Sequence, residues 1–128
     1  MSMLNLKEIK KRIPDAAKQQ IVVEESCTAD YEEKAKWLCE QMETGCIGYT
    51  DKPHGDKSVT LTIYTSVSFG KFLKSLKPGM KFRNRLGREF SIEGDPFIQN
   101  HYTCVRANGD TWYCDVVYDK DCEYTGGE

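Results

Sequence analysis

Seven basic residues occur between positions 71 and 88 with no acidic residue among them, the largest local departure from the average composition of the chain. Such a cluster can neutralise several phosphates of a nucleic acid in a salt-dependent way. It can equally meet an acidic protein surface, or form a solvated face that keeps an exposed edge strand from pairing. Six of these seven residues, all except Lys77, are the candidates for binding an anionic partner. They are Lys71, Lys74, Lys81, Arg83, Arg85 and Arg88.

The carboxyl end of the chain has the opposite charge. Between positions 110 and 128 six acidic residues accompany one lysine, a local balance of −5, whereas the whole chain of 128 residues has a net charge of −2. Asp119, Asp121 and Glu123 resemble the start of a calcium loop, but the sixth position is Tyr124 rather than the required glycine. We therefore expect residues 119–128 to form an acidic tail that folds back over the basic cluster and masks it.

Aromatic residues interleave with the basic cluster, and exposed rings would allow bases of a single strand to stack on them. Phe82 and Phe90, however, alternate with polar residues as core positions do. The strand expected over 59–64 also lacks the glycine- and aromatic-rich signature of an RNA-recognition motif. The sequence favours core packing for these rings.

Catalytic motifs are not found: the sequence contains no P-loop, no G-x-S-x-G, no G-x-G-x-x-G and no H-E-x-x-H. His101 and Cys104 are three residues apart in an expected strand, so their side chains should point to opposite faces. We expect no enzyme activity and no cofactor.

The six cysteines lack the C-x₂-C spacing of zinc sites, and the chain has only two histidines. The amino terminus becomes charged before the apolar stretch of a secretory signal could form, which favours a reducing cytoplasm. Buried, reduced thiols are therefore the favoured interpretation. A zinc site assembled from distant loops is the alternative.

Two helices are expected in the first part of the chain. Leu6, Ile9 and Ile13 have helical spacing and precede Pro14, which disfavours helix at the residue before it. A β-branched run over 20–24 predicts a strand. The second helix has apolar residues at i, i+4, i+7 and i+11, with Asp30 as the expected amino-terminal cap and Gly45 as the carboxy-terminal cap. Its apolar face is formed by Tyr31, Ala35, Leu38 and Met42.

A β-hairpin and a third helix follow. The runs 46–50 and 57–65 flank a Pro-His-Gly-Asp turn sequence, and the second run alternates apolar and polar residues. Phe69, Phe72 and Leu76 then have the spacing of a short helix, which Ser66 or Ser68 can cap.

Four strands are expected in the last third, over 80–84, 88–93, 101–106 and 111–118. Asn108-Gly109 is a strong hairpin signal. A two-residue turn there would pair Val105 with Trp112, whereas one bulge residue would place Cys104 on the same face as Cys114. The sequence leaves both registers open.

These elements predict one α+β domain over residues 1–128, with a helix and hairpin part (1–78), a β-rich part (79–118) and the acidic tail. From 20 to 84 the order is β-α-β-β-α-β, the ferredoxin-like order, and further antiparallel hairpins follow it. The alternative is an SH3-like barrel over 80–118 behind an α/β amino-terminal part.

The expected function is that of a small non-catalytic binding protein whose basic surface engages an anionic partner, foremost nucleic-acid phosphate. The alternative is a protein effector, either an inhibitor or an adaptor, that binds its target through a sheet edge and the charge-polarised surface. Apolar runs are too short to cross a membrane, so no membrane partner is expected.

Overall fold

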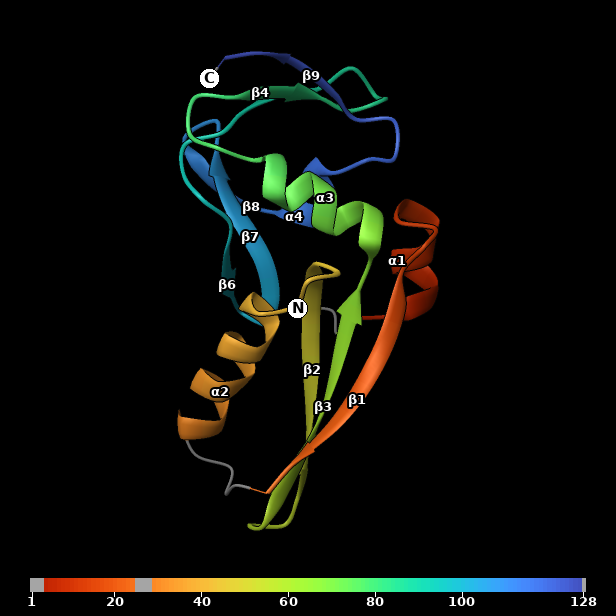
Figure 1. The fold of residues 1–128 in the computed structure, drawn as a ribbon, viewed down its shortest axis with the longest axis vertical. Coiled ribbons are helices and arrows are strands. Elements are labelled where there is room, and N and C mark those ends of the chain that lie inside the picture. The colour runs from red at the N-terminus through yellow and green to blue at the C-terminus, as the bar shows by residue number, and fades with distance from the viewer. Residues whose placement is uncertain (1–3, 25–28, 128) are drawn as a thin grey trace.

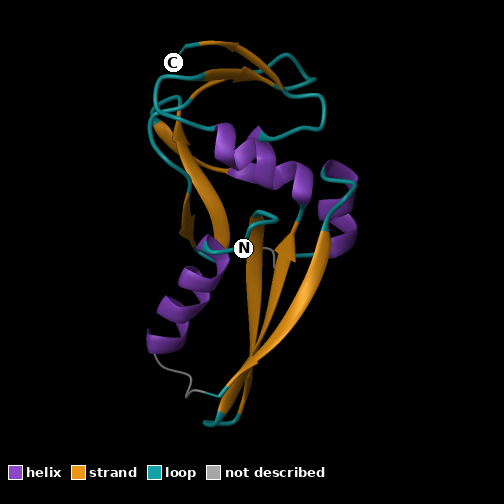
Figure 2. Ribbon diagram, in the orientation of Figure 1, coloured by secondary structure: helices purple, strands orange, loops and turns teal. Residues whose placement is uncertain are grey.

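The computed structural model describes residues 4–24 and 29–127. Its helices are α1 (Leu6–Arg12), α2 (Ala29–Glu40), α3 (Val67–Ser75) and α4 (Cys114–Val117). Its strands are β1 (Ala17–Val23), β2 (Cys46–His54), β3 (Ser58–Thr65), β4 (Lys81–Arg83), β5 (Glu89–Ser91), β6 (Phe97–Gln99), β7 (Tyr102–Ala107), β8 (Asp110–Tyr113) and β9 (Glu123–Gly126). Strands pair antiparallel in two sheets, so the chain is an α+β protein as predicted (Figures 1 and 2). No described helix is long and apolar enough to span a membrane.

The larger sheet has the order β1-β3-β2-β7-β6, and β8 pairs with β7. β3 lies between β1 and β2 and is antiparallel to both, so β1, α2 and β2 form a split βαβ unit. Val59, Leu61 and Ile63 alternate along β3 toward α2 and are fully buried. This alternation is the period-2 pattern that predicts β3. The three buried side chains pack against α2, which covers the lower end of the sheet (Figure 1).

β4 does not enter the larger sheet. It pairs with β5 and β9 in a second, three-stranded sheet, and β7 takes the place next to β2. After α3 the chain turns at Gly79, whose φ is +91°, and Phe82 then packs edge-on against Phe72 of α3 and Tyr124 of β9. The helices and strands from β1 to β4 therefore follow one another along the chain in the predicted β-α-β-β-α-β order. They do not form a ferredoxin-like sheet, because β4 lies in the smaller sheet. A separate SH3-like barrel is not formed either, because β7 and β8 belong to the larger sheet.

The last predicted strand, over 111–118, is wrong beyond Tyr113. The chain forms α4 there, and Cys114 and Val117 are fully buried while Val116 is 40% exposed. A continued strand would have turned Cys114 and Val116 to the same face, whereas a helical turn brings Cys114 and Val117 into the core together.

The hairpin before α4 has the two-residue turn. Asn108 and Gly109 both have positive φ, and Val105 pairs with Trp112. This is the geometry of a type I′ turn, whose twist matches that of the paired strands. The bulged alternative for the Cys104 register is therefore wrong.

Gly45 and Gly70 bring the loop after α2 against α3. Gly45 has a φ of +81°, and a Cβ added to it would lie 2.3 Å from the Cα of Gly70. A Cβ on Gly70 would lie 2.7 Å from the carbonyl oxygen of Thr44. Gly45 therefore does not cap α2, which ends earlier, at Glu40. The two glycines permit a backbone contact that fixes α3 beside the start of β2.

Candidate anion-binding surface

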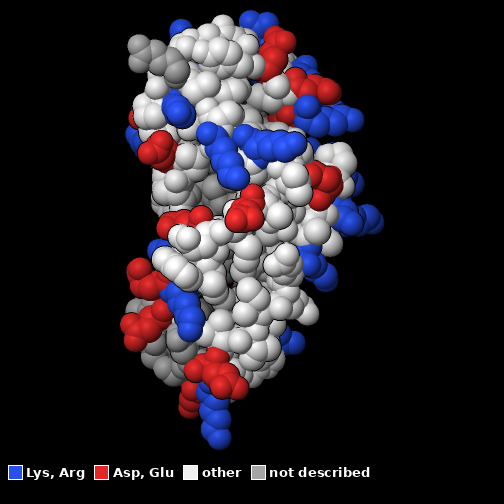
Figure 3. Space-filling model, in the orientation of Figure 1, with Lys and Arg blue, Asp and Glu red and all other residues white. Residues whose placement is uncertain are grey.

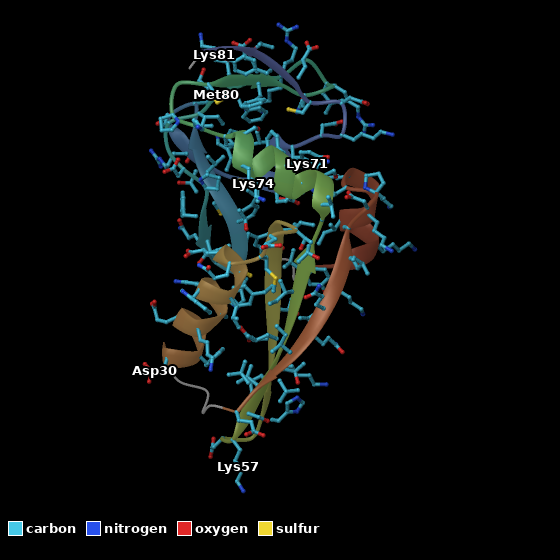
Figure 4. The ribbon with its side chains drawn as sticks, in the orientation of Figure 1. Asp30, Lys57, Lys71, Lys74, Met80 and Lys81 are labelled. Atoms are coloured by element: carbon cyan, nitrogen blue, oxygen red, sulfur yellow. The ribbon has the colours of Figure 1, made fainter. Side chains whose placement is uncertain are left out.

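Lys71 and Lys74 lie one turn apart on the exposed side of α3 (Figure 4). The helix begins where Ser66 Oγ accepts the Phe69 N–H at 3.0 Å, and Phe69 and Phe72 bury its opposite side. The two lysines therefore face solvent. Within the described part of the chain, neither lysine forms an ion pair.

Asp15 stabilises the start of α3, although it lies far from this helix in the sequence. Its carboxylate accepts the Ser68 N–H at 3.0 Å, the Ser68 hydroxyl at 2.6 Å and the Ser66 hydroxyl at 2.8 Å. Burial acts to raise the pKa of Asp15, but these hydrogen bonds outweigh it and hold the pKa below its ordinary value. The sequence predicted a cap from Ser66 or Ser68, and Ser66 is the cap, but the sequence contained no signal for the contribution of Asp15.

Lys81 and Arg83 flank the buried Phe82, so both side chains extend from the exposed side of β4. Arg85 lies after the end of β4, in the connection to β5. Lys81 and Arg83 thus share one face of the strand, whereas Arg85 does not belong to the strand.

The acidic segment folds back onto this basic strand, as predicted, but as a strand rather than a tail. β9 pairs with β4. Arg83 Nη1 lies 3.4 Å from Glu123 Oε1, Arg83 Nη2 lies 4.0 Å from Glu89 Oε2, and Arg85 Nε lies 3.1 Å from Asp119 Oδ2. Both arginines are thus already next to carboxylate oxygens.

Arg88 is held by aromatic rings instead. Its guanidinium carbon lies 4.5 Å from the centroid of the Trp112 ring and 5.5 Å from that of Phe90. Trp112 is fixed in turn, because its indole N–H donates to the Ala107 carbonyl at 2.9 Å. This is a cation–π contact that the sequence did not indicate.

The aromatic residues near the basic cluster belong mainly to the core. Phe82 and Phe90 are buried, as predicted. Tyr102 is buried and stacks on Tyr113 with 4.4 Å between ring centroids. Stacking of nucleic-acid bases on these rings would need side chains that the fold has already packed.

The six candidate residues therefore divide into two groups. Lys71, Lys74 and Lys81 are exposed without ion pairs in the described part of the chain, whereas Arg83, Arg85 and Arg88 are engaged within the protein. Figure 4 places Lys71 and Lys74 on α3 at the middle of the molecule and Lys81 at the end that carries the small sheet. In Figure 3, basic and acidic side chains alternate over this face rather than forming one uniform patch.

A cavity of about 380 Å³ opens beside the α3 lysines, in the hollowed middle of the face seen in Figure 3. Lys74 and Leu73 line it from α3, Glu40 from α2, and Phe97 and Ile98 from β6. Its lining combines apolar side chains with charges of both signs. The sequence contains no local signal for this cavity, because its walls come from segments far apart along the chain.

Two thiols also line this cavity. Cys39 of α2 and Cys46 of β2 are both buried. The interaction with the Cys39 thiol, together with burial, raises the pKa of the Cys46 thiol. A neutral, buried thiol is a poor nucleophile, because the thiolate is the reactive form.

The remaining described cysteines are also free thiols, and Cys27 lies outside the described residues. Cys104 and Cys114 are buried, and Cys122 is partly buried. Burial raises the pKa of both Cys104 and Cys122 to about 11. The predicted burial is thus confirmed for four of the five described cysteines. Across residues 4–24 and 29–127, no group of three or more His, Cys, Asp or Glu side chains could hold a metal ion.

His101 has a carboxylate partner that the sequence did not reveal. Its Nε2 lies 2.7 Å from Asp51 Oδ2, and its ring centroid lies 4.7 Å from that of Tyr49. The pair joins β2 to the turn before β7, and we assign it a structural role.

Comparison of the chain with protein-family profiles, with curated proteins and with solved structures gives no significant match. The fold therefore assigns this protein to the α+β class.

Proposed function

We propose that this chain is a small, non-catalytic binding protein that engages the phosphates of a nucleic acid through the lysines of α3 and the basic residues of β4 and of the connection that follows it. One observation carries the proposal: Arg83 and Arg85 already hold carboxylate oxygens of Glu123 and Asp119. A carboxylate is chemically similar to a phosphate oxygen as an acceptor for guanidinium groups. These arginines are therefore anion sites, occupied by the protein's own acidic segment.

The exposed lysines supply the part of the surface that is open to a partner. Lysine is a flexible point charge that suits contacts with phosphates without sequence readout. Lys71 and Lys74 would meet the nucleic acid first, and phosphates would then compete with Glu123 and Asp119 for the arginines. The exposed ion pair of Arg83 with Glu123 is weak enough for such an exchange.

The test is a titration of a fluorescent oligonucleotide, single-stranded and duplex, at several salt concentrations. Lys71→Glu combined with Lys74→Glu is expected to weaken binding at least about tenfold and to reduce the salt slope by about two, since each phosphate contact contributes about 0.9. Lys52→Glu combined with Lys57→Glu is the matched control, because Lys52 lies in β2 and Lys57 in the turn between β2 and β3, far from α3 (Lys57 is labelled in Figure 4). Equal losses in both double variants would reduce the effect to overall charge and refute the proposal.

A second candidate function, binding of a protein target at a sheet edge, is favoured by the cavity beside β6. β6 is an edge strand of the larger sheet, and Phe97 lines the cavity with Glu40 and Glu43. The chemistry fits an extended segment of a target protein that carries an apolar side chain and a neighbouring basic one.

Phe97→Asp tests this second candidate in a nuclease-treated lysate. A target bound by the wild type and by Lys71→Glu/Lys81→Glu, neither of which lines the cavity, but not by Phe97→Asp, would support it. A target retained by Phe97→Asp would contradict it.

A further inference from the structure

β1 is a long strand at the edge of the larger sheet. It pairs with β3 over seven consecutive residues, Ala17 to Val23, with no bulge in the register. Among residues 4–24 and 29–127, no strand pairs with its other side. In a ferredoxin-like sheet the fourth strand would lie there, but β4 belongs to the small sheet instead. The outer backbone groups of β1 are thus available for pairing.

The usual protection of an edge strand is nearly absent from β1. Edge strands are commonly protected by proline, bulges or several charged side chains. β1 has neither a proline nor a bulge, and Lys18 is its only charged residue. Val22 is 64% exposed on the face that it shares with Lys18 and Gln20. An apolar side chain on an open edge favours a strand partner.

The charges that flank β1 complement each other in one self-paired register. When two copies of β1 run antiparallel and Ile21 lies opposite its own copy, Gln20 lies opposite Val22 and Lys18 lies opposite Glu24. Both Lys18 and Glu24 are exposed, and their even spacing places them on the same face. The two-fold symmetry forms this pair twice. A shift of the two-fold centre by one residue would move Lys18 away from Glu24 on both sides.

We propose that β1 pairs with β1 of a second copy of this chain, antiparallel and centred on Ile21, to form a two-fold symmetric dimer. The two larger sheets then become one continuous sheet through the dimer. Such an isologous contact uses the same segment on both partners, which is why a self-complementary strand satisfies it. The inference is independent of the α3 lysines and goes beyond the proposed function.

The test is a charge exchange, measured as molar mass by light scattering and sedimentation over a range of protein concentrations. The wild type is expected to dimerise. Lys18→Glu is expected to weaken the dimer about tenfold or more, because it places like charges opposite each other twice. Glu24→Lys should do the same. The double variant Lys18→Glu/Glu24→Lys restores opposite charges and should recover the wild-type dissociation constant to within about threefold.

Lys52→Glu is the matched control, since Lys52 is an exposed lysine of β2 and has no place in the β1 register. Circular dichroism of each variant checks that the monomer remains folded. A wild type that is monomeric at every concentration overturns the proposal. So does a dimer that Lys18→Glu leaves unchanged, or a double variant that fails to recover.

Discussion

Arg85 and Asp119 form an ion pair of 3.1 Å between the connection that follows β4 and the segment that leads into β9, and only 14% of the Asp119 side chain is exposed. The pair joins the basic and acidic parts of the sequence, which lie 34 positions apart (119 − 85). With the Arg83–Glu123 pair, it explains why a polarised sequence produces a mixed surface. It also makes the acidic segment a competitor for any anion that binds Arg83 or Arg85.

Neutralising that segment should strengthen anion binding. In Asp119→Asn combined with Glu123→Gln, we expect tighter binding of an oligonucleotide and a salt slope steeper by up to about two, because two arginines become free to contact phosphates. Fluorescence anisotropy at several salt concentrations measures both quantities. Asp121→Asn removes a nearby charge that pairs with neither arginine, and it should change binding much less. Similar effects of the two changes would show that the ion pairs do not compete with phosphate.

Gly70→Ala should destabilise the protein although alanine favours helix. The added Cβ would meet backbone atoms of Thr44 and Gly45 at 2.7 and 2.9 Å, and backbone yields little. We expect a loss of about 2 kcal/mol in the free energy of unfolding, as for an overpacked core site, measured by denaturant titration. Gly94→Ala is the control, because no atom of a described residue lies within 4 Å of its added Cβ. A Gly70→Ala variant as stable as the control would contradict the close contact between α3 and the α2–β2 loop.

Asp15→Ala should cost stability in a pH-dependent way. The folded-state pKa of Asp15 lies below its ordinary value, so its carboxylate stabilises the fold above about pH 4, the unfolded pKa. That contribution disappears as the pH falls through the folded-state pKa. At pH 7 we expect a loss of about 1 kcal/mol from the missing acceptor at the start of α3, and a smaller loss at pH 3. Asp56→Ala, in the exposed β2–β3 turn, should have little effect at either pH. An Asp15→Ala loss that is equal at both values would contradict the assignment.

Arg12→Gln should also cost more stability as the pH rises, but through a buried carboxyl group whose pKa is raised. Arg12 Nη2 lies 2.7 Å from Asp115 Oδ2, and the Asp115 side chain is 4% exposed. Burial raises the pKa of Asp115 and Arg12 opposes that rise, so the variant raises the pKa further. When folding raises the pKa of a carboxyl group, its protonated form stabilises the folded state fully below the unfolded-state pKa. That stabilisation is lost as the pH rises through the folded-state pKa.

The cost of Arg12→Gln should therefore grow from near zero at pH 3 to about 1–2 kcal/mol at pH 8, because a buried carboxylate loses its partner. Chemical unfolding at both pH values measures it. Lys11→Gln breaks only the exposed pair with Glu8 and serves as the control. A cost that falls as the pH rises would contradict the role of Arg12.

Local patterns in the sequence determined most of the individual elements. The spacing of Leu6, Ile9 and Ile13 predicted α1, the alternation in 59–63 predicted β3, and Asn108-Gly109 predicted the turn between β7 and β8. Each of these signals lies within one element, where side-chain periodicity and backbone preference act over a few residues. Local signals failed where burial decided the conformation, as at α4, and where strands were short, as at β6 and β9.

The same division between local patterns and tertiary contacts applies to the candidate anion-binding surface. The sequence identified the basic residues and the acidic segment, and it predicted that one would fold over the other. Only the tertiary structure decided which residues remain available: β9 brings Glu123 and Asp119 to Arg83 and Arg85, Trp112 holds Arg88, and the α3 lysines stay exposed. The cavity beside α3 and the open edge of β1 also arise from the way distant segments pair. The physical reason is that strand pairing and ion pairing depend on which segments come together in space. The sequence specifies those contacts through the packing of the whole chain and not through any local pattern.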